Sequence, residues 1–180
     1  YKGFLTGHGN FRNDIAVTVP YKGTRPSEKP THLQALRKHL VDSWGFVIVD
    51  GIEADDAVGI EAYKVSEDES VMVHIDKDLN QSRGHHYNYR KKEKYYVSEF
   101  AGWYSFYLQI LTGDRIDNIE GLKGIGPAKG AKILKDCKTV EDLYDAVLKA
   151  YDNDAVRVLE NGQLLYLQRK EGDVWQPPQR

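Results

Sequence analysis

The sequence predicts an α/β fold in which helices flank a sheet of mainly parallel strands. Two continuous apolar runs, Phe46–Val49 and Ser70–Ile75, are separated by a helical pattern that begins near Glu53. Such runs are typical of buried parallel strands, and the strand–helix–strand order is typical of a right-handed crossover. Beyond residue 98 the patterns are helical, interrupted by a glycine-rich segment at residues 121–130. We therefore expect an α/β core at residues 1–111 and a helical segment at residues 112–180.

The first 45 residues predict a turn-rich start, a short strand and one helix. Glycines make residues 1–12 turn-like, and Ile15–Val19 favours an extended strand. From Thr31 the apolar residues recur at helical spacing as far as Gly45, which predicts a helix between these two positions.

The remaining patterns complete the core and build the helical segment. Residues 87–89 and 94–97 predict short edge strands joined by the basic run 90–94, and residues 98–111 predict a helix. Further helices are expected at residues 128–136 and 139–150 and from about residue 153. The tail after Glu171 is expected to be loose.

Composition and charge narrow the class of protein. The 180 residues carry a net charge of −2, with acidic residues gathered at 53–56, 76–78 and 114–117 and basic ones at 22–29, 90–94 and 123–135. No apolar run is long enough to cross a membrane, so no membrane partner is expected. Cys137 is the single cysteine and cannot form an internal disulfide, which suits a reducing cytoplasm. The histidines form no ligand pattern, and His74 is expected to be a core or strand-end residue.

Three acidic clusters follow predicted elements at the edge where α/β folds bind ligands. Their members are Glu53, Asp55, Asp56, Asp76, Asp78, Asp114 and Asp117. Carboxylates gathered in one place must take up protons or bind cations, and oxygen ligands favour Mg²⁺ or Mn²⁺. A pair of such ions about 3.5–4 Å apart supports in-line attack of water on a phosphodiester. The alternative interpretation is that acidic residues merely favour helix starts, where they complement the helix dipole.

The glycine-rich segment between two helices predicts a site for a DNA phosphate. Glycines at this density allow a sharp turn and close approach to a partner, and backbone N–H groups at the next helix start attract anions. The residues expected to contact DNA here are Lys123, Gly124, Gly126, Lys129 and Lys132. A plain helix-capping turn is the alternative.

Read together, these motifs resemble the 5′-to-3′ exonuclease and flap endonuclease family of phages and bacteria. The resemblance is carried by Tyr21-Lys-Gly-Thr-Arg25, Glu53-Ala-Asp-Asp56, Asp76-Lys-Asp78 and Thr112-Gly-Asp-Arg-Ile-Asp-Asn-Ile-Glu-Gly-Leu-Lys-Gly-Ile-Gly-Pro127. It implies a PIN-like 5′ nuclease core with a helix-hairpin-helix (helix-three-turn-helix) segment, and an enzyme that hydrolyses DNA phosphodiesters near 5′ ends.

The resemblance also implies roles for individual residues. Glu53, Asp55 and Asp56 are expected at one metal ion, and Asp76, Asp78, Asp114 and Asp117 at a second. Lys22 and Arg25 match a catalytic basic pair, and Tyr21 matches an aromatic residue that stacks on an unpaired base. The hairpin residues imply a grip on duplex DNA and a K⁺ ion held by backbone carbonyls. DNA ends, flaps and branched duplexes are the expected partners of a monomeric, cytoplasmic protein active in DNA replication.

The family normally begins with a strand that bears an aspartate, and a second aspartate lies shortly before the equivalent of Arg12. Neither is evident here, so the core is expected to be N-terminally incomplete. Two alternatives therefore stay open. The chain is a catalytically impaired module that binds branched DNA, or it is a Mg²⁺-dependent phosphatase that uses the same acidic edge on small molecules.

Overall fold

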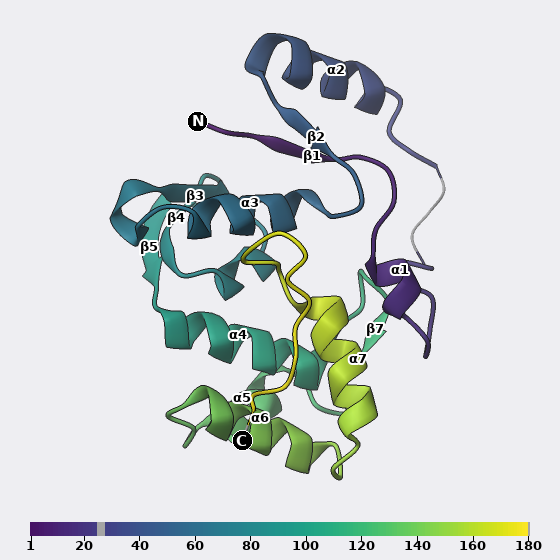
Figure 1. The fold of residues 1–180 in the computed structure, drawn as a ribbon, viewed down its shortest axis with the longest axis vertical. Coiled ribbons are helices and arrows are strands. Elements are labelled where there is room, and N and C mark those ends of the chain that lie inside the picture. The colour runs from purple at the N-terminus through teal and green to yellow at the C-terminus, as the bar shows by residue number, and fades with distance from the viewer. Residues whose placement is uncertain (25–27, 180) are drawn as a thin grey trace.

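The structure is a computed structural model that describes residues 1–24 and 28–179 (Figure 1). The elements of the first half are, in chain order, β1 (Phe4–Thr6), α1 (Arg12–Ile15), α2 (Leu33–Trp44), β2 (Val47–Val49), α3 (Ala54–Tyr63), η1 (Glu67–Glu69), β3 (Val71–His74), η2 (Asp78–Gln81), β4 (Gly84–Asn88) and β5 (Glu93–Val97). They are followed by α4 (Glu99–Thr112), β6 (Gly113–Asp114), β7 (Ile119–Glu120), α5 (Pro127–Leu134), α6 (Val140–Ala150) and α7 (Ala155–Leu165).

The described strands form separate small sheets. β1 pairs with β2 in parallel, β3 pairs with β4 in parallel, and β5 runs antiparallel to β4. Helix α3 connects β2 to β3 and packs against β1, β2 and β3, so one helix covers strands of both parallel pairs. This arrangement confirms the predicted α/β class, although the sheet is divided where a continuous one was expected.

The two apolar strands are less buried than the sequence predicted. Val47 in β2 is 53% exposed and Val73 in β3 is 62% exposed. In β3 the buried positions are Met72 and His74, which alternate with exposed valines because successive side chains of a strand point to opposite faces. The prediction of buried strands is therefore wrong for one face of β3 and, because Ile48 is also 49% exposed, for both faces of β2.

The hydrophobic core lies in the helical half. Phe106, Tyr107, Ile110 and Leu111 of α4 are fully buried and pack with residues of α5, α6 and α7. Helix α4 begins where expected, since the Ser98 hydroxyl accepts a hydrogen bond from the Ala101 N–H at 3.2 Å. This core contains residues from both sides of the predicted boundary between residues 1–111 and 112–180. The two-part division of the chain stays a prediction.

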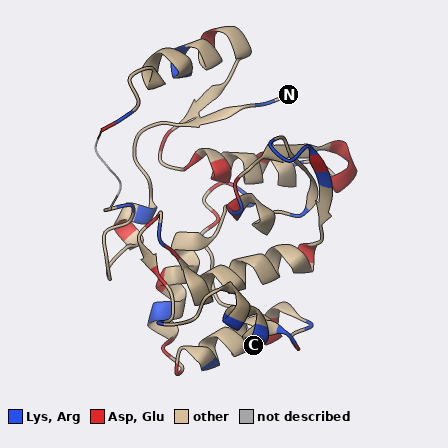
Figure 2. Ribbon diagram, turned by 180° about the vertical axis from the view of Figure 1, so that it is seen from behind, with Lys and Arg blue, Asp and Glu red and all other residues tan. Residues whose placement is uncertain are grey.

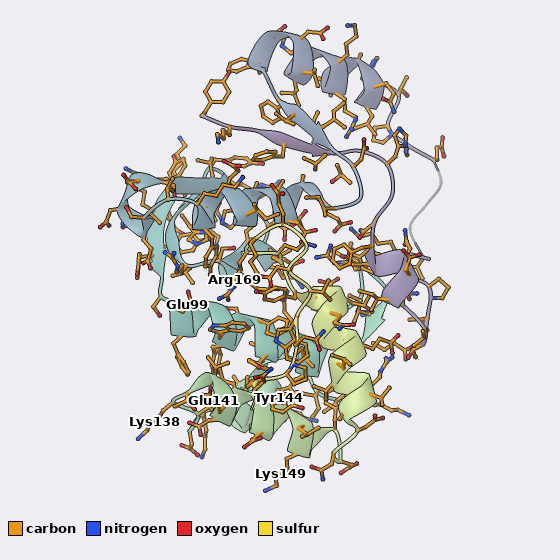
Figure 3. All side chains as sticks on the ribbon, viewed as in Figure 1. Glu99, Lys138, Glu141, Tyr144, Lys149 and Arg169 are labelled. Carbon is orange, nitrogen blue, oxygen red and sulfur yellow. The ribbon has the colours of Figure 1, made fainter. Side chains whose placement is uncertain are left out.

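The C-terminal tail is packed, and the expectation of a loose tail is wrong. Trp175 is 4% exposed and its ring lies 5.4 Å from that of Phe106. A Cβ on Gly162 would lie 2.3 Å from the Trp175 ring, so the glycine makes room for the indole. Arg169 packs on the face of Trp103 and forms an ion pair with Glu99 (Figure 3).

The predicted strand at Ile15–Val19 is also wrong. Residues Arg12–Ile15 form a single helical turn, and the N–H groups of Val17 and Thr18 then donate to the carboxylate of Glu160 at 2.8 and 2.7 Å. A side chain of α7 thus takes the hydrogen bonds that a neighbouring strand would have accepted.

Basic and acidic residues gather at particular places on the fold. Figure 2 shows the basic residues of α5 close to the C-terminal mark. The acidic turn of η1 lies in the other half of the molecule, where the sheets are. None of the described helices is long and apolar enough to cross a membrane.

Candidate active site

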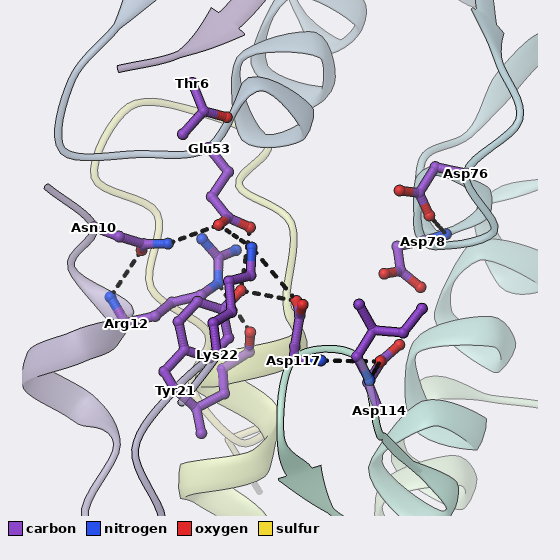
Figure 4. A network of polar contacts seen from close by, with 12 residues as sticks. Thr6, Asn10, Arg12, Tyr21, Lys22, Glu53, Asp76, Asp78, Asp114 and Asp117 are labelled. Carbon is purple, nitrogen blue, oxygen red and sulfur yellow. Dashed lines mark hydrogen bonds and ion pairs between the residues drawn. The ribbon is translucent and has the colours of Figure 1, made fainter. Parts of the chain in front are cut away.

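One group of charged side chains surrounds Glu53 at the start of α3 (Figure 4). The Lys22 ammonium forms an ion pair with Glu53 and lies 3.6 Å from the Asp117 carboxylate. The Tyr21 hydroxyl lies 3.1 Å from Glu53 Oε2 and 3.0 Å from Asp117 Oδ2, and Asn10 donates to Glu53 at 2.9 Å. Lys22 and Tyr21 therefore bridge two carboxylates from distant parts of the chain.

The backbone fixes Lys22 at this position. Lys22 adopts a φ of 55°, an uncommon conformation for a residue with a side chain, and its N–H donates to the Asp117 carbonyl at 2.8 Å. Asn118 in turn donates to the Pro20 carbonyl at 2.9 Å. The segment that carries Lys22 is thus attached to the turn that carries Asp117. Arg25, the other predicted catalytic residue, lies outside the described residues.

A second group lies at the end of β3 and the start of η2. Asp76 Oδ1 accepts the N–H of Asp78 at 3.0 Å, and Gln109 of α4 donates to the Asp78 carboxylate. The Lys77 ammonium lies 2.8 Å from Asp114 and 4.0 Å from Asp78. The motif Asp76-Lys-Asp78 therefore supplies a cation as well as two carboxylates to this part of the site.

Burial and repulsion between neighbouring carboxylates raise the pKa values of two of these side chains. Burial, followed by the charge of Glu53, raises the pKa of Asp55 to about 6. Burial, followed by the charge of Asp76, raises the pKa of Asp78 to about 6. The charge of Asp76 also acts to raise the pKa of Asp55, so the two groups influence each other. For Asp114 burial also acts to raise the pKa, but the hydrogen bond and charge of Lys77, together with the N–H groups of Ile116 and Asp117, lower it overall.

Asp56 does not point into this site, contrary to the prediction. It is fully buried, and its two oxygens accept from the Arg12 guanidinium at 2.7 and 2.8 Å. The same oxygens also accept the N–H groups of Glu53 and Gln168 at 3.0 and 3.1 Å. The carboxylate is fully engaged, so the structure gives Asp56 a structural role and not the expected place beside a metal ion.

Tyr21 is also placed differently from the prediction. Its side chain is 8% exposed and belongs to the hydrophobic core, so the ring is not free to stack on an unpaired base. Burial, followed by the charge of Glu53, raises the pKa of the phenol well above its ordinary value. The hydroxyl therefore stays protonated and serves as a hydrogen-bond donor between carboxylates.

The donor set fits a hard divalent cation, although the carboxylates do not converge on one point. In the described part of the chain, no three ligand-type side chains are close enough together to hold a metal ion as they lie. Carboxylate oxygens are nevertheless the ligands that Mg²⁺ and Mn²⁺ prefer, and carboxyl groups with raised pKa values gain most from a nearby cation. The residues that remain available are Glu53, Asp55, Asp76, Asp78, Asp114 and Asp117.

The glycine hairpin between β7 and α5 is exposed. Gly124 has a φ of 78°, which favours glycine, and a Cβ at Gly124 or Gly126 would meet no atom within 4 Å. Lys123, Lys129 and Lys132 are exposed around it, and Lys129 donates to the Gly124 carbonyl at 2.9 Å. The backbone is therefore open to a partner, with three cations beside it.

Sequence reasoning missed several residues that shape the site. Lys77 lies inside the motif Asp76-Lys-Asp78, so the sequence contained the signal that a cation lies beside Asp78. Arg12, Asn10 and Gln109 carry no local signal, because each acts through a contact more than 30 residues away along the chain.

Comparisons with known proteins place the chain more closely than its fold and its acidic edge do. No protein-family model matches it. DNA polymerase I of Deinococcus radiodurans is 33% identical over 145 residues, which are 70% of this chain and 15% of that protein. Flap endonuclease Xni of Shewanella sp. (strain W3-18-1) is 27% identical over 162 residues, 83% of this chain and 62% of that protein. The chain thus spans less than two thirds of these relatives.

Solved structures agree on the fold. T5 5′-exonuclease, solved with bound divalent metal ions (zinc), matches with a TM-score of 0.66 at 18% identity, covering 90% of this chain and 73% of that one. The T5 D15 flap endonuclease in a complex with DNA and metal ions matches with a TM-score of 0.64 at 18% identity, over 90% of this chain and 72% of that one. These comparisons confirm the predicted resemblance to the 5′-to-3′ exonuclease and flap endonuclease family.

Proposed function

We propose that this chain is a divalent-metal-dependent nuclease that hydrolyses DNA phosphodiesters near 5′ ends. The observation that carries the proposal is the acidic edge in which Asp55 and Asp78 have raised pKa values and Lys22 lies against Glu53 and Asp117. Such an edge attracts hard cations and places an ammonium group where a phosphate would enter. The sequence relationship to a flap endonuclease supports the same activity.

Two Mg²⁺ or Mn²⁺ ions, when bound, would activate the attacking water and stabilise the leaving oxygen. Glu53 and Asp55 would hold one ion, and Asp76, Asp78, Asp114 and Asp117 the other, directly or through water. Lys22 supplies a positive charge for the scissile phosphate, because Glu53 and Asp117 hold its ammonium at the edge. Arg25 belongs to the same proposal as a second cation.

The hairpin supplies the grip on duplex DNA. Its open backbone at Gly124 and Gly126 and the exposed lysines beside it suit a phosphate backbone that is held without reading the bases. A K⁺ ion held by hairpin carbonyls is a finer part of the proposal. We also propose that flaps and branched duplexes are substrates, that the protein acts as a monomer in the cytoplasm of a bacterium or phage-infected cell, and that it serves DNA replication.

The test is cleavage of a 5′-labelled flap substrate in Mg²⁺ or Mn²⁺. The unmodified chain is compared with Asp76→Ala and Lys22→Ala, and with Asp136→Ala as a matched control, because Asp136 is an exposed acid at the end of α5. Cleavage that Asp76→Ala abolishes, that Lys22→Ala slows strongly and that Asp136→Ala leaves unchanged would support the proposal. Tight DNA binding without cutting in either metal would instead favour the binding module, and failure to bind DNA at low salt would favour a phosphatase.

A further inference from the structure

The segment that carries Asp76 and Asp78 is held at both ends by buried histidines. Nδ1 of His74 lies 2.7 Å from the Asp76 carbonyl, at the start of the segment. Nε2 of His86 lies 3.0 Å from the Ser82 carbonyl, at its end. The backbone of residues 76–82 is therefore attached to β3 at one end and to β4 at the other.

The two histidines also contact each other. His74 Nε2 lies 2.7 Å from His86 Nδ1, and His86 is fully buried. Carbonyl oxygens only accept, so a histidine nitrogen that bonds to the Asp76 or Ser82 carbonyl does so as the donor.

Tyr95 of β5 adds a third attachment in the middle of the segment. Its hydroxyl donates to Asn80 Oδ1 at 2.7 Å, and its ring stacks on His86 with centroids 5.1 Å apart. The strand register explains the cluster, because Met72 lies opposite His86 and His86 lies opposite Tyr95. His85, the neighbour of His86, points to the other side of the strand and contacts the exposed Asp68.

We propose that His74 and His86 are positioning residues for the Asp76 and Asp78 carboxylates. Gln109 orients the Asp78 side chain, whereas the histidine contacts with the Asp76 and Ser82 carbonyls hold the backbone of the turn at its two ends. Removal of a group that hydrogen-bonds to a metal-binding segment and orients its ligands commonly weakens metal affinity by about 10–100-fold. This inference rests on the proposed function, since it treats the two aspartates as ligands of a divalent cation.

The experiment measures Mn²⁺ binding calorimetrically, in the absence of DNA. The unmodified chain is compared with His86→Leu, with His74→Gln and with His85→Leu as the matched control. We expect His86→Leu to weaken Mn²⁺ binding by about tenfold. His74→Gln should lose less, because a glutamine amide can still donate to the Asp76 carbonyl. His85→Leu should bind as the unmodified chain does, and binding of duplex DNA in EDTA should be the same for all four proteins.

The outcomes separate this inference from the proposal that it rests on. Equal Mn²⁺ affinity in the unmodified chain and in folded His86→Leu would overturn the positioning role and leave the proposed function standing. Absence of Mn²⁺ binding by the unmodified chain would contradict both. If circular dichroism shows that His86→Leu does not fold, His74→Leu takes its place, since it removes the donor to the Asp76 carbonyl and keeps the His86 contact with the Ser82 carbonyl.

Discussion

Arg12 and Asp56 form a bidentate ion pair that is shielded from solvent. The guanidinium also donates to the carbonyls of Leu164 and Tyr166 at 2.9 and 2.7 Å, at the end of α7. The pair thus joins α1, the start of α3 and the end of α7. Within one four-residue motif, Glu53 and Asp55 serve the acidic edge while Asp56 holds the scaffold beneath it.

Removing the guanidinium should destabilise the protein strongly. Arg12→Leu leaves a buried carboxylate without its counter-ion, and such losses cost about 3–5 kcal/mol. Urea denaturation measures the free energy of unfolding. Lys38→Ala is the control, because the Lys38–Asp42 pair is exposed, and it should change stability by less than about 0.5 kcal/mol.

A double variant tests the cause. Arg12→Leu combined with Asp56→Leu removes the stranded charge, so the pair should recover part of the stability that Arg12→Leu alone loses. Recovery stays partial because Asp56 also accepts two backbone N–H groups. A double variant less stable than Arg12→Leu would show that loss of packing, and not the unpaired charge, dominates.

The Lys77 ammonium should compete with a divalent cation for Asp114. It lies 2.8 Å from that carboxylate and is the main cause of its low pKa. Lys77→Met should therefore strengthen Mn²⁺ binding, by about threefold to tenfold if the competition is worth about 1 kcal/mol. Lys77→Arg keeps the charge and should bind Mn²⁺ as the unmodified chain does. Weaker binding by Lys77→Met would contradict the competition.

Acid should release the metal. The carboxyls of Asp55 and Asp78 have pKa values of about 6, so protons compete with Mn²⁺ as the pH falls from 7 to 5. Calorimetry across this range should find affinity falling by up to about two logarithmic units per pH unit below pH 6. Affinity that is constant between pH 7 and 5 would show that neither carboxyl contributes to the site.

The same two groups should make the metal-free protein less stable above pH 6. Their folded pKa values are raised above the ordinary 3.8, so between pH 3.8 and 6 the folded state binds more protons than the unfolded state. Stability from these groups is present at low pH and is lost as the pH rises through 6. Asp55→Asn should therefore raise the metal-free unfolding free energy at pH 7 by about 1–3 kcal/mol while weakening Mn²⁺ binding.

Local patterns predicted the elements well, because caps and apolar spacing act within a few residues. The helix ending at Gly45 is present, with Gly45 in the left-handed conformation at φ 64°, and the helix predicted from residue 98 begins directly after Ser98. The packing of Trp175 and the pairing of Arg12 with Asp56 depend on contacts between distant segments. No spacing rule encodes such contacts, so the sequence predicted a loose tail and a metal-binding Asp56.

Glu160 of α7 should influence cleavage through Lys22. It accepts the N–H groups of Val17 and Thr18 and thereby fixes the segment that leads to Lys22. Lys22→Ala should lower the cleavage rate by about 100-fold, as loss of a charge beside the reacting phosphate does. Glu160→Ala should lower it by about tenfold, since small misplacements of a reacting group are costly.

A double-mutant cycle distinguishes this effect from general destabilisation. If Glu160 acts through Lys22, the double variant should cleave at the rate of Lys22→Ala alone, because the ammonium that Glu160 positions is already absent. If the reductions in cleavage rate caused by the two substitutions multiply in the double variant, Glu160 instead acts through the stability of the fold. Glu160→Gln, which keeps an acceptor oxygen for the two N–H groups, should cleave faster than Glu160→Ala while Lys22 is present, and the two should cleave alike in the Lys22→Ala background.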